Sequence, residues 1–254
     1  MTSDLNLAVD LARGAGEILL RLREQLGDDI DGATGDAESN AYLLRELATH
    51  RPDDAVLSEE AADDPRRLDA ERVWIIDPLD GTREFTERQP DGSWRTDFAV
   101  HIALWTRAAG LTAGVVGLPA RNQVHRSDAG PVTLPDAAGR PLRVAVSRTR
   151  PPMLVTELGK HLDVELVGMG SAGVKVMSVV TGETDAYIHG GGQYEWDSAA
   201  PVAVALGTGL HASRLDGSPL VYNRENPWLP DLLVCHPDKV AELVALLAQI
   251  EGNQ

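Results

Sequence analysis

Three acidic segments of the sequence combine residue types and spacings that could bind cations, and the most informative of them contains Asp77 and Asp80. The apolar, β-branched run 73–76 before them predicts a strand buried on both faces. Pro78 lacks an N–H and should end the β-ladder, so that a turn directs both carboxylates to one point. Carboxylate oxygens suit Mg²⁺, and the carbonyl oxygen of Leu79 could be a third ligand. The structural alternative is an Asp-Gly turn in which Asp80 caps a helix.

The residues that follow Asp80 could bind an anion. Gly81 and Thr82 are predicted to open a helix or turn whose free N–H groups would face the cations, where a phosphate could lie. The Thr82 hydroxyl could orient a water molecule there. This segment therefore predicts a site for cations and a phosphate together.

The two other acidic segments indicate a cation site only if they lie close to the first. Glu59 and Glu60 follow the apolar run 55–57, and alone they are typical of a strand end in solvent. Asp197 precedes the Ala-rich segment 198–206, and alone it is typical of a helix cap. If these segments lie beside Asp77 and Asp80, however, the carboxylates would repel one another unless cations bind between them.

The elements that must position these residues fall into two halves. The Pro-, Gly- and Ala-rich segment 131–141 predicts a boundary, which gives an N-terminal α+β half of residues 1–135 and a C-terminal α/β half of residues 136–254. The hydrophobic patterns predict helices at 5–26, 37–51, 153–161, 172–181, 198–206 and 238–251, and strands at 55–57, 73–76, 98–104, 111–118, 143–146, 164–167, 185–188 and 232–235.

The acidic, Gly-rich segment 27–36 is predicted to be a loop between the first two helices. Residues 27–38 nearly fit a calcium-binding EF-hand loop, but Gly27 stands at the first position, where that loop needs an acid. We therefore interpret the segment as a connection rather than a calcium site.

Composition excludes several classes of function. The formal net charge of −16 disfavours binding to nucleic acid or to an anionic membrane, because both need a basic surface. The single cysteine, Cys235, allows no disulfide within the chain and is expected to be a small buried hydrophobe. No run approaches the ~18 apolar residues of a membrane span. We expect a cytoplasmic protein whose partner is a small phosphorylated metabolite.

Taken together, these segments resemble the inositol monophosphatase-like superfamily of magnesium-dependent, lithium-sensitive phosphatases. The family's Asp-Pro-(Ile/Leu/Val)-Asp-Gly-Thr motif corresponds to residues 77–82, its upstream Glu-Glu pair to residues 59–60, and its Trp-Asp-x-Ala-(Ala/Gly) run to residues 196–200. The resemblance implies a layered αβαβα sandwich, two to three Mg²⁺ ions in each site, and assembly as a homodimer.

The resemblance also implies a role for each matching residue. The implied ligands are Glu59, Asp77 and the Leu79 carbonyl for the first metal, and Asp77, Asp80 and Asp197 for the second, while Glu59 helps to hold a third through water. Thr82 and Asp36 are implied to activate the attacking water, and the N–H groups of Gly81 and Thr82 to bind the phosphate. The implied reaction is in-line displacement by metal-activated water, with no covalent intermediate.

Residues around these motifs indicate which substrate the protein acts on. The extension 83–85 (Arg-Glu-Phe) after the Asp-Gly-Thr motif, and the segment 213–220, are similar to the CysQ type of the superfamily, which removes the 3'-phosphate of 3'-phosphoadenosine 5'-phosphate. Gly190 stands where inositol phosphatases carry a substrate-binding glutamate. Inositol monophosphatase or fructose-1,6-bisphosphatase activity is the alternative within this fold, and a non-catalytic cation-binding protein is the alternative of another class.

Substrate contacts beyond the phosphate are expected from two segments. The loop containing Gly170, Ser171 and Ala172 is expected to touch the sugar or base. Tyr194 could stack on adenine, or it could simply pack against its neighbours. Lys175 is expected to be solvated, with pairing to a distant phosphate as the alternative. The histidines, including His101, show no metal-binding spacing.

Overall fold

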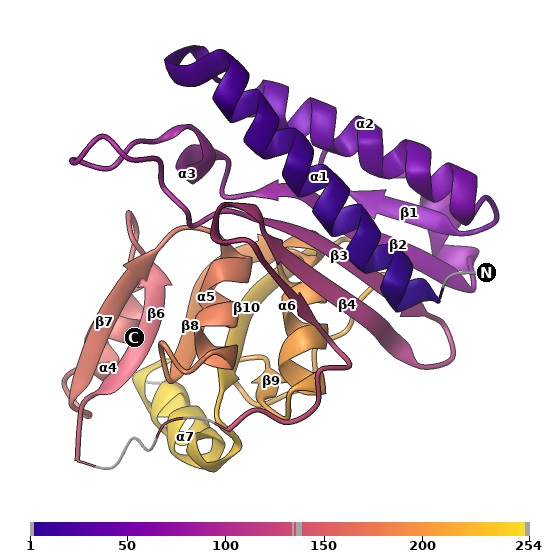
Figure 1. Ribbon diagram of the computed structural model, residues 1–254. Coiled ribbons are helices and arrows are strands. Elements are labelled where there is room, and N and C mark those ends of the chain that lie inside the picture. Colours follow the sequence, from indigo (N-terminus) through magenta and orange to yellow (C-terminus); the bar gives the residue numbers. More distant parts are fainter. Residues whose placement is uncertain (1–2, 134, 136–138, 252–254) are drawn as a thin grey trace.

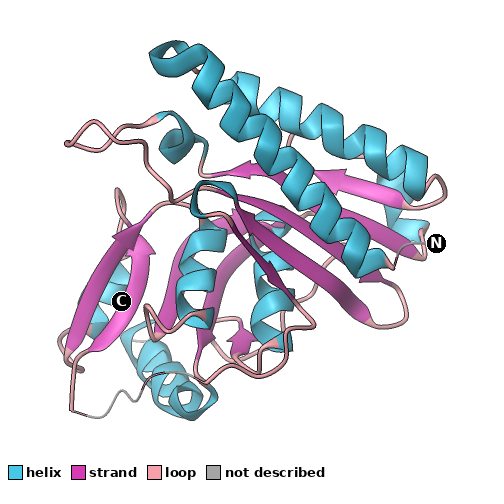
Figure 2. Ribbon diagram, in the orientation of Figure 1, coloured by secondary structure: helices cyan, strands magenta, loops and turns pink. Residues whose placement is uncertain are grey.

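The computed structural model describes residues 3–133, 135 and 139–251, which form five alternating layers of helices and strands (Figure 1). Helices α1 and α2 cover one face of the first sheet, and helices α5 and α6 lie between the two sheets. Helices α4 and α7 pack on the remaining face of the second sheet. The predicted αβαβα sandwich is confirmed, and Figure 2 shows the two sheets in one colour against the helices.

The elements of the first half surround a sheet with the strand order β1-β2-β3-β4-β5. They are α1 (Asp4–Leu26), α2 (Gly32–His50), β1 (Ala55–Ser58), β2 (Arg72–Asp80), α3 (Thr82–Thr86), β3 (Ala99–Thr106), β4 (Gly110–Leu118) and β5 (Gln123–Arg126), with short 3₁₀ helices at Gly27–Asp29, Pro65–Asp69 and Pro119–Arg121.

The elements of the second half surround a sheet with the order β7-β6-β8-β10-β9. They are β6 (Leu142–Ser147), α4 (Met153–Leu158), β7 (Val164–Met169), α5 (Ala172–Val180), β8 (Ala186–Tyr194), α6 (Glu195–Gly207), β9 (His211–Ser213), β10 (Trp228–Cys235) and α7 (Val240–Glu251), with a 3₁₀ helix at Pro237–Lys239. Among the described helices, none combines the length and the apolarity that crossing a membrane requires.

Strand β2 is an interior strand of the first sheet, between β1 and β3. Its side chains alternate between the two faces, so that Trp74 and Ile76 pack under α1 and α2, while Val73 and Ile75 face α5 and α6. All four are fully buried. The strand is therefore packed on both faces along its length, and this packing also restrains the residues at its end.

The end of β2 bends at an irregularity in its pairing with β3. The regular register between the two strands is interrupted between Asp77 and Asp80, and Asp80 pairs again with Ala99. The prediction that Pro78 ends the ladder was wrong for this reason: the missing N–H of proline falls inside the irregular segment, where no ladder bond is needed.

Close packing holds α6 on the first sheet. A Cβ atom at Gly114 of β4 would lie 2.4 Å from the Cβ of Ala203 and 2.9 Å from the carbonyl oxygen of Ala200. Only glycine permits this approach, which places α6 directly on the strand. The first turn of the same helix carries Asp197.

The structure corrects several predicted boundaries. Helix α2 begins at Gly32, because the Asp31 carboxylate accepts a hydrogen bond from the N–H of Thr34 (2.7 Å) and caps the helix. Asp36 therefore lies on a helix and not in the predicted loop. Strands β5 and β9 were not predicted. The boundary between residues 135 and 136 lies partly outside the described residues, and the division into two domains stays a prediction.

Candidate active site

Three carboxylates from the two halves of the chain converge. Ligand atoms of Asp77, Asp80 and Asp197 all lie within 4.8 Å of one another. The first two come from the end of β2 in the first sheet. The third comes from the first turn of α6, which directly follows β8 of the second sheet. The convergence that the sequence predicted for these side chains is present.

Asp77 is the most deeply buried of the three, with 1% of its surface exposed. Its Oδ1 accepts a hydrogen bond from the N–H of Leu79 (3.1 Å), whereas its Oδ2 is buried without a hydrogen-bond partner. Burial, reinforced by the negative charges of Asp80 and Glu59, holds the pKa of Asp77 well above its usual value. An unpaired buried carboxylate oxygen is costly, so a cation would find a ready ligand here.

Asp80 is held by donors from the second half of the chain. Its Oδ2 accepts hydrogen bonds from the Ser171 hydroxyl (2.5 Å) and from the N–H of Gly173 (2.7 Å). Burial alone would raise the pKa of Asp80, but the neighbouring His101 and Lys175 outweigh burial and hold it below its usual value. Asp80 therefore stays charged, and its orientation depends on the loop before α5.

Asp197 has a structural role as well as a place in the cluster. Its Oδ2 accepts a hydrogen bond from the N–H of Tyr194 (2.6 Å), the residue before α6, and so satisfies a backbone donor at the start of that helix. Burial and the charge of Asp80 raise the pKa of Asp197 to about 6. Asp197 thus stabilises the start of α6, as the helix-cap alternative proposed, and it also belongs to the carboxylate cluster.

Glu59 lies just beyond β1 and approaches the same cluster from the side of solvent. Burial of its carboxyl group and the charge of Asp197 raise the pKa of Glu59 to about 7. The residue as a whole is exposed, so its carboxyl group borders both solvent and the buried aspartates. Glu60 is also exposed.

Asp36 and Thr82 meet beside the aspartates, although they come from α2 and α3. Burial and the charge of Glu60 raise the pKa of Asp36 to about 7, and a hydrogen bond with Thr82 partly offsets this shift. The Thr82 hydroxyl oxygen also lies 3.2 Å from the carbonyl oxygen of Leu79. A carboxyl group that titrates near neutral pH beside a hydroxyl can accept or return a proton.

Gly81 connects β2 to α3 through a left-handed backbone conformation with φ of 93°. A Cβ atom at this position would lie 3.2 Å from the carbonyl oxygen of Asp97 and 3.3 Å from the Cβ of Ser171. Both the backbone angle and the close approach require glycine. The phosphate-binding role of the N–H groups of Gly81 and Thr82 stays a prediction.

His101 is a site residue that the sequence analysis missed. It is fully buried on β3, with Nε2 at 3.2 Å from Oδ2 of Asp80 and Nδ1 at 3.8 Å from Oδ2 of Asp77. Its Nδ1 also lies 3.1 Å from the carbonyl oxygen of Trp196 and donates to it. His101 thus links both β2 aspartates to the start of α6. A pairwise spacing rule could not find it, because its partners lie on other elements.

Lys175 is also placed differently from the prediction, which had it solvated. It lies on α5, whose residues are all buried, and only 7% of its surface is exposed. Its ammonium group lies 5.4 Å from the ring centre of Tyr187. Burial lowers the pKa of Lys175, while the charges of Asp80, Glu84, Asp197 and Asp97 oppose that shift.

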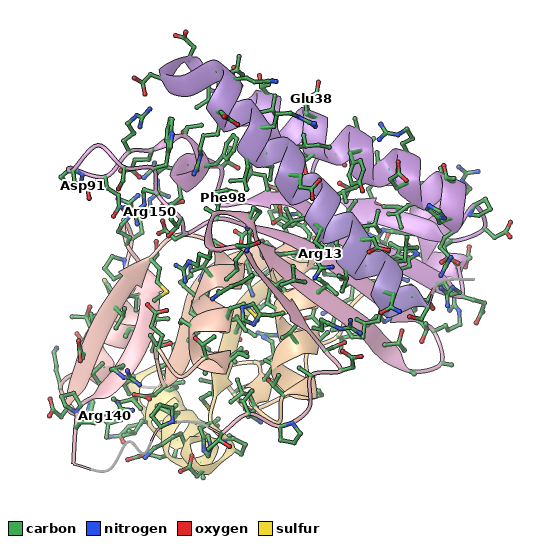
Figure 3. All side chains as sticks on the ribbon, in the orientation of Figure 1. Arg13, Glu38, Asp91, Phe98, Arg140 and Arg150 are labelled. Carbon is green, nitrogen blue, oxygen red and sulfur yellow. The ribbon has the colours of Figure 1, made fainter. Side chains whose placement is uncertain are left out.

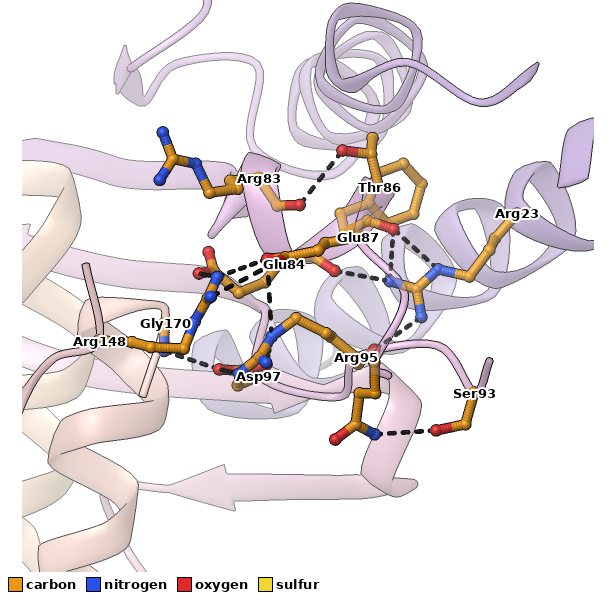
Figure 4. A network of polar contacts seen from close by, with 12 residues as sticks. Arg23, Arg83, Glu84, Thr86, Glu87, Ser93, Arg95, Asp97, Arg148 and Gly170 are labelled. Atoms are coloured by element: carbon orange, nitrogen blue, oxygen red, sulfur yellow. Dashed lines mark hydrogen bonds and ion pairs between the residues drawn. The ribbon is translucent and has the colours of Figure 1, made fainter. Parts of the chain in front are cut away.

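The loop before α5 is fixed by a network of polar contacts (Figure 4). The N–H of Gly170 donates to Asp97 (2.7 Å), and Asp97 also accepts two hydrogen bonds from Arg95 (2.8 and 2.6 Å). Arg148 joins the same network by donating to Glu84 (2.9 Å). The hydrogen-bonding groups of Gly170 and Ser171 are therefore engaged within the protein, and their predicted substrate contacts stay predictions.

The network connects the site to a loop that reaches away from the body of the molecule. Asp91 lies at the tip of this loop, between α3 and β3 (Figure 3). Arg23 of α1 holds the two sides of the loop together, since its guanidinium donates to the carbonyl oxygens of Phe85 (2.5 and 2.9 Å) and Arg95 (2.9 Å). Helix α1 thus supports the site indirectly.

A cavity of about 340 Å³ opens beside the carboxylates, and its lining includes Asp80, Ala172, Tyr194 and Asp197. The ring of Tyr194 stacks on that of Trp196, with centroids 4.7 Å apart, and 45% of the tyrosine is exposed. One face of Tyr194 is thus packed, as one alternative proposed, while the residue still borders the cavity.

The donor set fits a hard divalent cation. Every candidate ligand atom is an oxygen, one of them is buried without a partner, and burial together with the neighbouring carboxylates raises the pKa values of Glu59, Asp77 and Asp197. Such a cluster must bind protons or cations at neutral pH. Oxygen-only coordination favours Mg²⁺ over metals that prefer nitrogen or sulfur.

Comparison with known proteins agrees with this geometry. A model of the inositol monophosphatase family matches residues 1–250. The chain belongs to the inositol monophosphatase family. A 3'-phosphoadenosine 5'-phosphate phosphatase of Mycobacterium leprae is 52% identical over 265 residues, which cover 98% of this chain and 94% of that protein. A Mycobacterium tuberculosis protein of the same name is 50% identical, with 92% and 89% of the two chains covered.

The fold also matches solved structures of the family. The crystal structure of CysQ from Bacteroides thetaiotaomicron superposes with a TM-score of 0.77 and 27% identity, covering 92% of this chain and 97% of that one. The inositol monophosphatase II structure from Staphylococcus superposes with the same TM-score at 22% identity, with 98% of both chains covered, and shows the shared fold.

Proposed function

We propose that this protein is a Mg²⁺-dependent phosphatase that hydrolyses the 3'-phosphate of 3'-phosphoadenosine 5'-phosphate to give AMP and phosphate. The observation that carries the proposal is the convergence of Asp77, Asp80 and Asp197 from two sheets, in a chain about half identical to mycobacterial phosphatases named for this substrate. Gly190, which offers no side chain for ring hydroxyls, makes inositol phosphates the weaker candidates.

The roles of the residues follow from their positions. We assign Glu59, Asp77, the Leu79 carbonyl, Asp80 and Asp197 as ligands for two to three Mg²⁺ ions. Bound Mg²⁺ would neutralise the phosphate ester, lower the pKa of a water molecule and stabilise the leaving oxygen. Asp36, with its pKa near 7, is suited to accept the proton of the attacking water, with Thr82 positioned between them as a relay.

A substrate panel tests the proposal. Steady-state rates of phosphate release are measured with 3'-phosphoadenosine 5'-phosphate, inositol 1-phosphate and fructose 1,6-bisphosphate, each with and without Mg²⁺. The expected result is a clear preference for the nucleotide and dependence on Mg²⁺. A preference for either of the other esters would reject the substrate assignment.

The same panel decides the alternative of another class. A non-catalytic cation-binding protein would bind Mg²⁺ in calorimetry and release no phosphate from any of the three esters. That outcome would overturn the enzymatic proposal, while leaving the assignment of the metal ligands intact.

Three further properties belong to the same proposal. Removal of this nucleotide, a by-product of sulfate assimilation, would place the enzyme in that process. Inhibition by Li⁺ and assembly as a homodimer are expected from the family resemblance. Activity in the presence of Li⁺ and the molar mass by sedimentation equilibrium test these two expectations separately.

A further inference from the structure

The cavity beside the carboxylates has features that phosphate and metal binding do not use. Besides Asp80 and Asp197, its lining includes the aromatic side chains of Tyr187, Tyr194 and Trp228. Its volume of about 340 Å³ lies within the range of small-molecule sites. Aromatic surface next to an anion site suits a ligand that joins a phosphate to a flat, partly apolar group.

Gln193 is the unexplained residue of this lining. It follows Gly191 and Gly192, whose positive φ angles coincide with an irregularity in the pairing of β8 with β10, and it lines the cavity together with Tyr187 and His189. Only 7% of Gln193 is exposed, and neither its Nε2 nor its Oε1 has a hydrogen-bond partner. The neighbouring His189 is already engaged, since its Nε2 contacts the carbonyl oxygen of Gly192 (2.9 Å).

An unpaired primary amide at this depth is unfavourable for folding. Buried polar groups in native proteins are nearly always hydrogen-bonded, and each one left unpaired lowers stability. Replacing such a group by an apolar one of the same shape would remove that penalty. No hydrogen bond within the described chain therefore accounts for the amide of Gln193, whereas a ligand in the cavity would provide hydrogen-bond partners for it.

We propose that Gln193 determines base specificity by binding the adenine of the nucleotide substrate through its side-chain amide. An amide presents a donor and an acceptor side by side, which complements the N6 amino donor and the N7 acceptor of adenine, whereas guanine presents two acceptors, O6 and N7, on that edge. Because Asp80 and Asp197 line the same cavity, a base held at Gln193 belongs to a substrate whose phosphate lies at the carboxylates. This inference rests on the proposed function and adds to it the residue that reads the base.

The test compares two bases in variants that differ only in the amide. Gln193→Met keeps the length of the side chain and removes its hydrogen bonds, whereas Gln193→Glu keeps acceptors and removes donors. Gln123→Met, at an exposed glutamine of β5, is the matched control. For each protein, kcat/KM is measured with 3'-phosphoadenosine 5'-phosphate and with 3'-phosphoguanosine 5'-phosphate, and the unfolding midpoint is measured in urea.

The expected result combines lost specificity with retained stability. In Gln193→Met the adenine-to-guanine ratio of kcat/KM falls about 10-fold or more, mainly through KM, while the unfolding midpoint stays equal to the wild-type value or rises. Gln193→Glu keeps an acceptor for the N6 amino group but loses the donor to the ring nitrogen, so kcat/KM for the adenine nucleotide falls in this variant as well. Gln123→Met leaves both measurements unchanged.

Two outcomes would overturn the inference in distinguishable ways. If the wild type hydrolyses neither nucleotide, the proposed function fails and the inference fails with it. If the wild type hydrolyses the adenine nucleotide but Gln193→Met keeps its adenine-to-guanine ratio, the function stands and only the role of Gln193 is rejected. A large fall in the unfolding midpoint together with an unchanged ratio would show instead that the amide has a structural partner.

Discussion

Replacement of Ser171 should separate the stability of this protein from its activity. The Ser171 hydroxyl donates to Asp80 (2.5 Å) and accepts from the N–H of Val174 (3.0 Å), which caps α5. The backbone of Ser171 has φ of 53° and ψ of 130°, a conformation that favours glycine. Ser171→Ala loses both hydrogen bonds and keeps the strain, whereas Ser171→Gly loses the bonds and relieves the strain.

The magnitudes follow from these contacts. The hydrogen bond to a charged group contributes about 2 kcal/mol, and the cap about 1 kcal/mol. Ser171→Ala should therefore lower the free energy of unfolding by roughly 3 kcal/mol. Relief of the backbone strain should return about 1–3 kcal/mol in Ser171→Gly, so the glycine variant should be clearly more stable than the alanine variant.

We expect the two Ser171 variants to differ in stability but to lose activity to a similar extent. Both variants lose the donor that orients Asp80, and loss of a group that orients a metal ligand typically lowers metal affinity or activity about 10- to 100-fold. Urea unfolding and phosphate release over a range of Mg²⁺ concentrations measure the two properties, with Ser93→Ala in an exposed loop as the control. Equal stability of the two variants would refute the strain argument, and wild-type activity in either would refute the role of Ser171 at Asp80.

Three other changes have expected outcomes. Asp77→Asn should lower the rate of phosphate release by several orders of magnitude at saturating Mg²⁺, and a near-normal rate would show that the ligand assignment is wrong. Asp185 accepts hydrogen bonds from Arg140 (2.6 and 2.7 Å), and although burial opposes this, Arg140 and Arg143 hold its pKa below the usual value. Its contribution to stability is therefore present above about pH 4 and is lost as the pH falls through the folded pKa. In urea unfolding, Asp185→Asn should cost about 3 kcal/mol at pH 7 and progressively less in acid, whereas the exposed Asp128→Asn should cost less than about 1 kcal/mol; equal costs would contradict the burial argument. Lys175→Met removes a buried cation that faces the carboxylates and should raise KM for the nucleotide in steady-state kinetics, so an unchanged KM would place the substrate elsewhere.

The sequence was sufficient to predict the carboxylate cluster, because each acid is tied to a local signal. Asp77 and Asp80 follow the apolar run 73–76, and Asp197 precedes the Ala-rich segment 198–206, so their places near element ends could be deduced. Only the family resemblance indicated that these element ends, which lie far apart in the chain, meet in the fold.

Residues whose roles depend on packing could not be predicted in the same way. His101 lies within an apolar strand and meets Asp80 only through the pairing of β3 with β2. Lys175 was expected in solvent because of its charge, although α5 is apolar on every side, which is the pattern of a buried helix. The start of α2 was missed because Gly and Asp residues suggested a loop, and the cap at Asp31 carried the opposite signal.

The close approach of α6 to β4 has a consequence for variation at positions remote from the chemistry. A side chain at Gly114 would clash with Ala200 and Ala203 and displace α6, and this displacement would also move Asp197 in the first turn of that helix. An exchange of glycine for alanine in the middle of a sheet could then weaken cation binding without touching one ligand. Tolerance to mutation in this protein should therefore be judged by which helix a residue supports, as much as by its distance from the carboxylates.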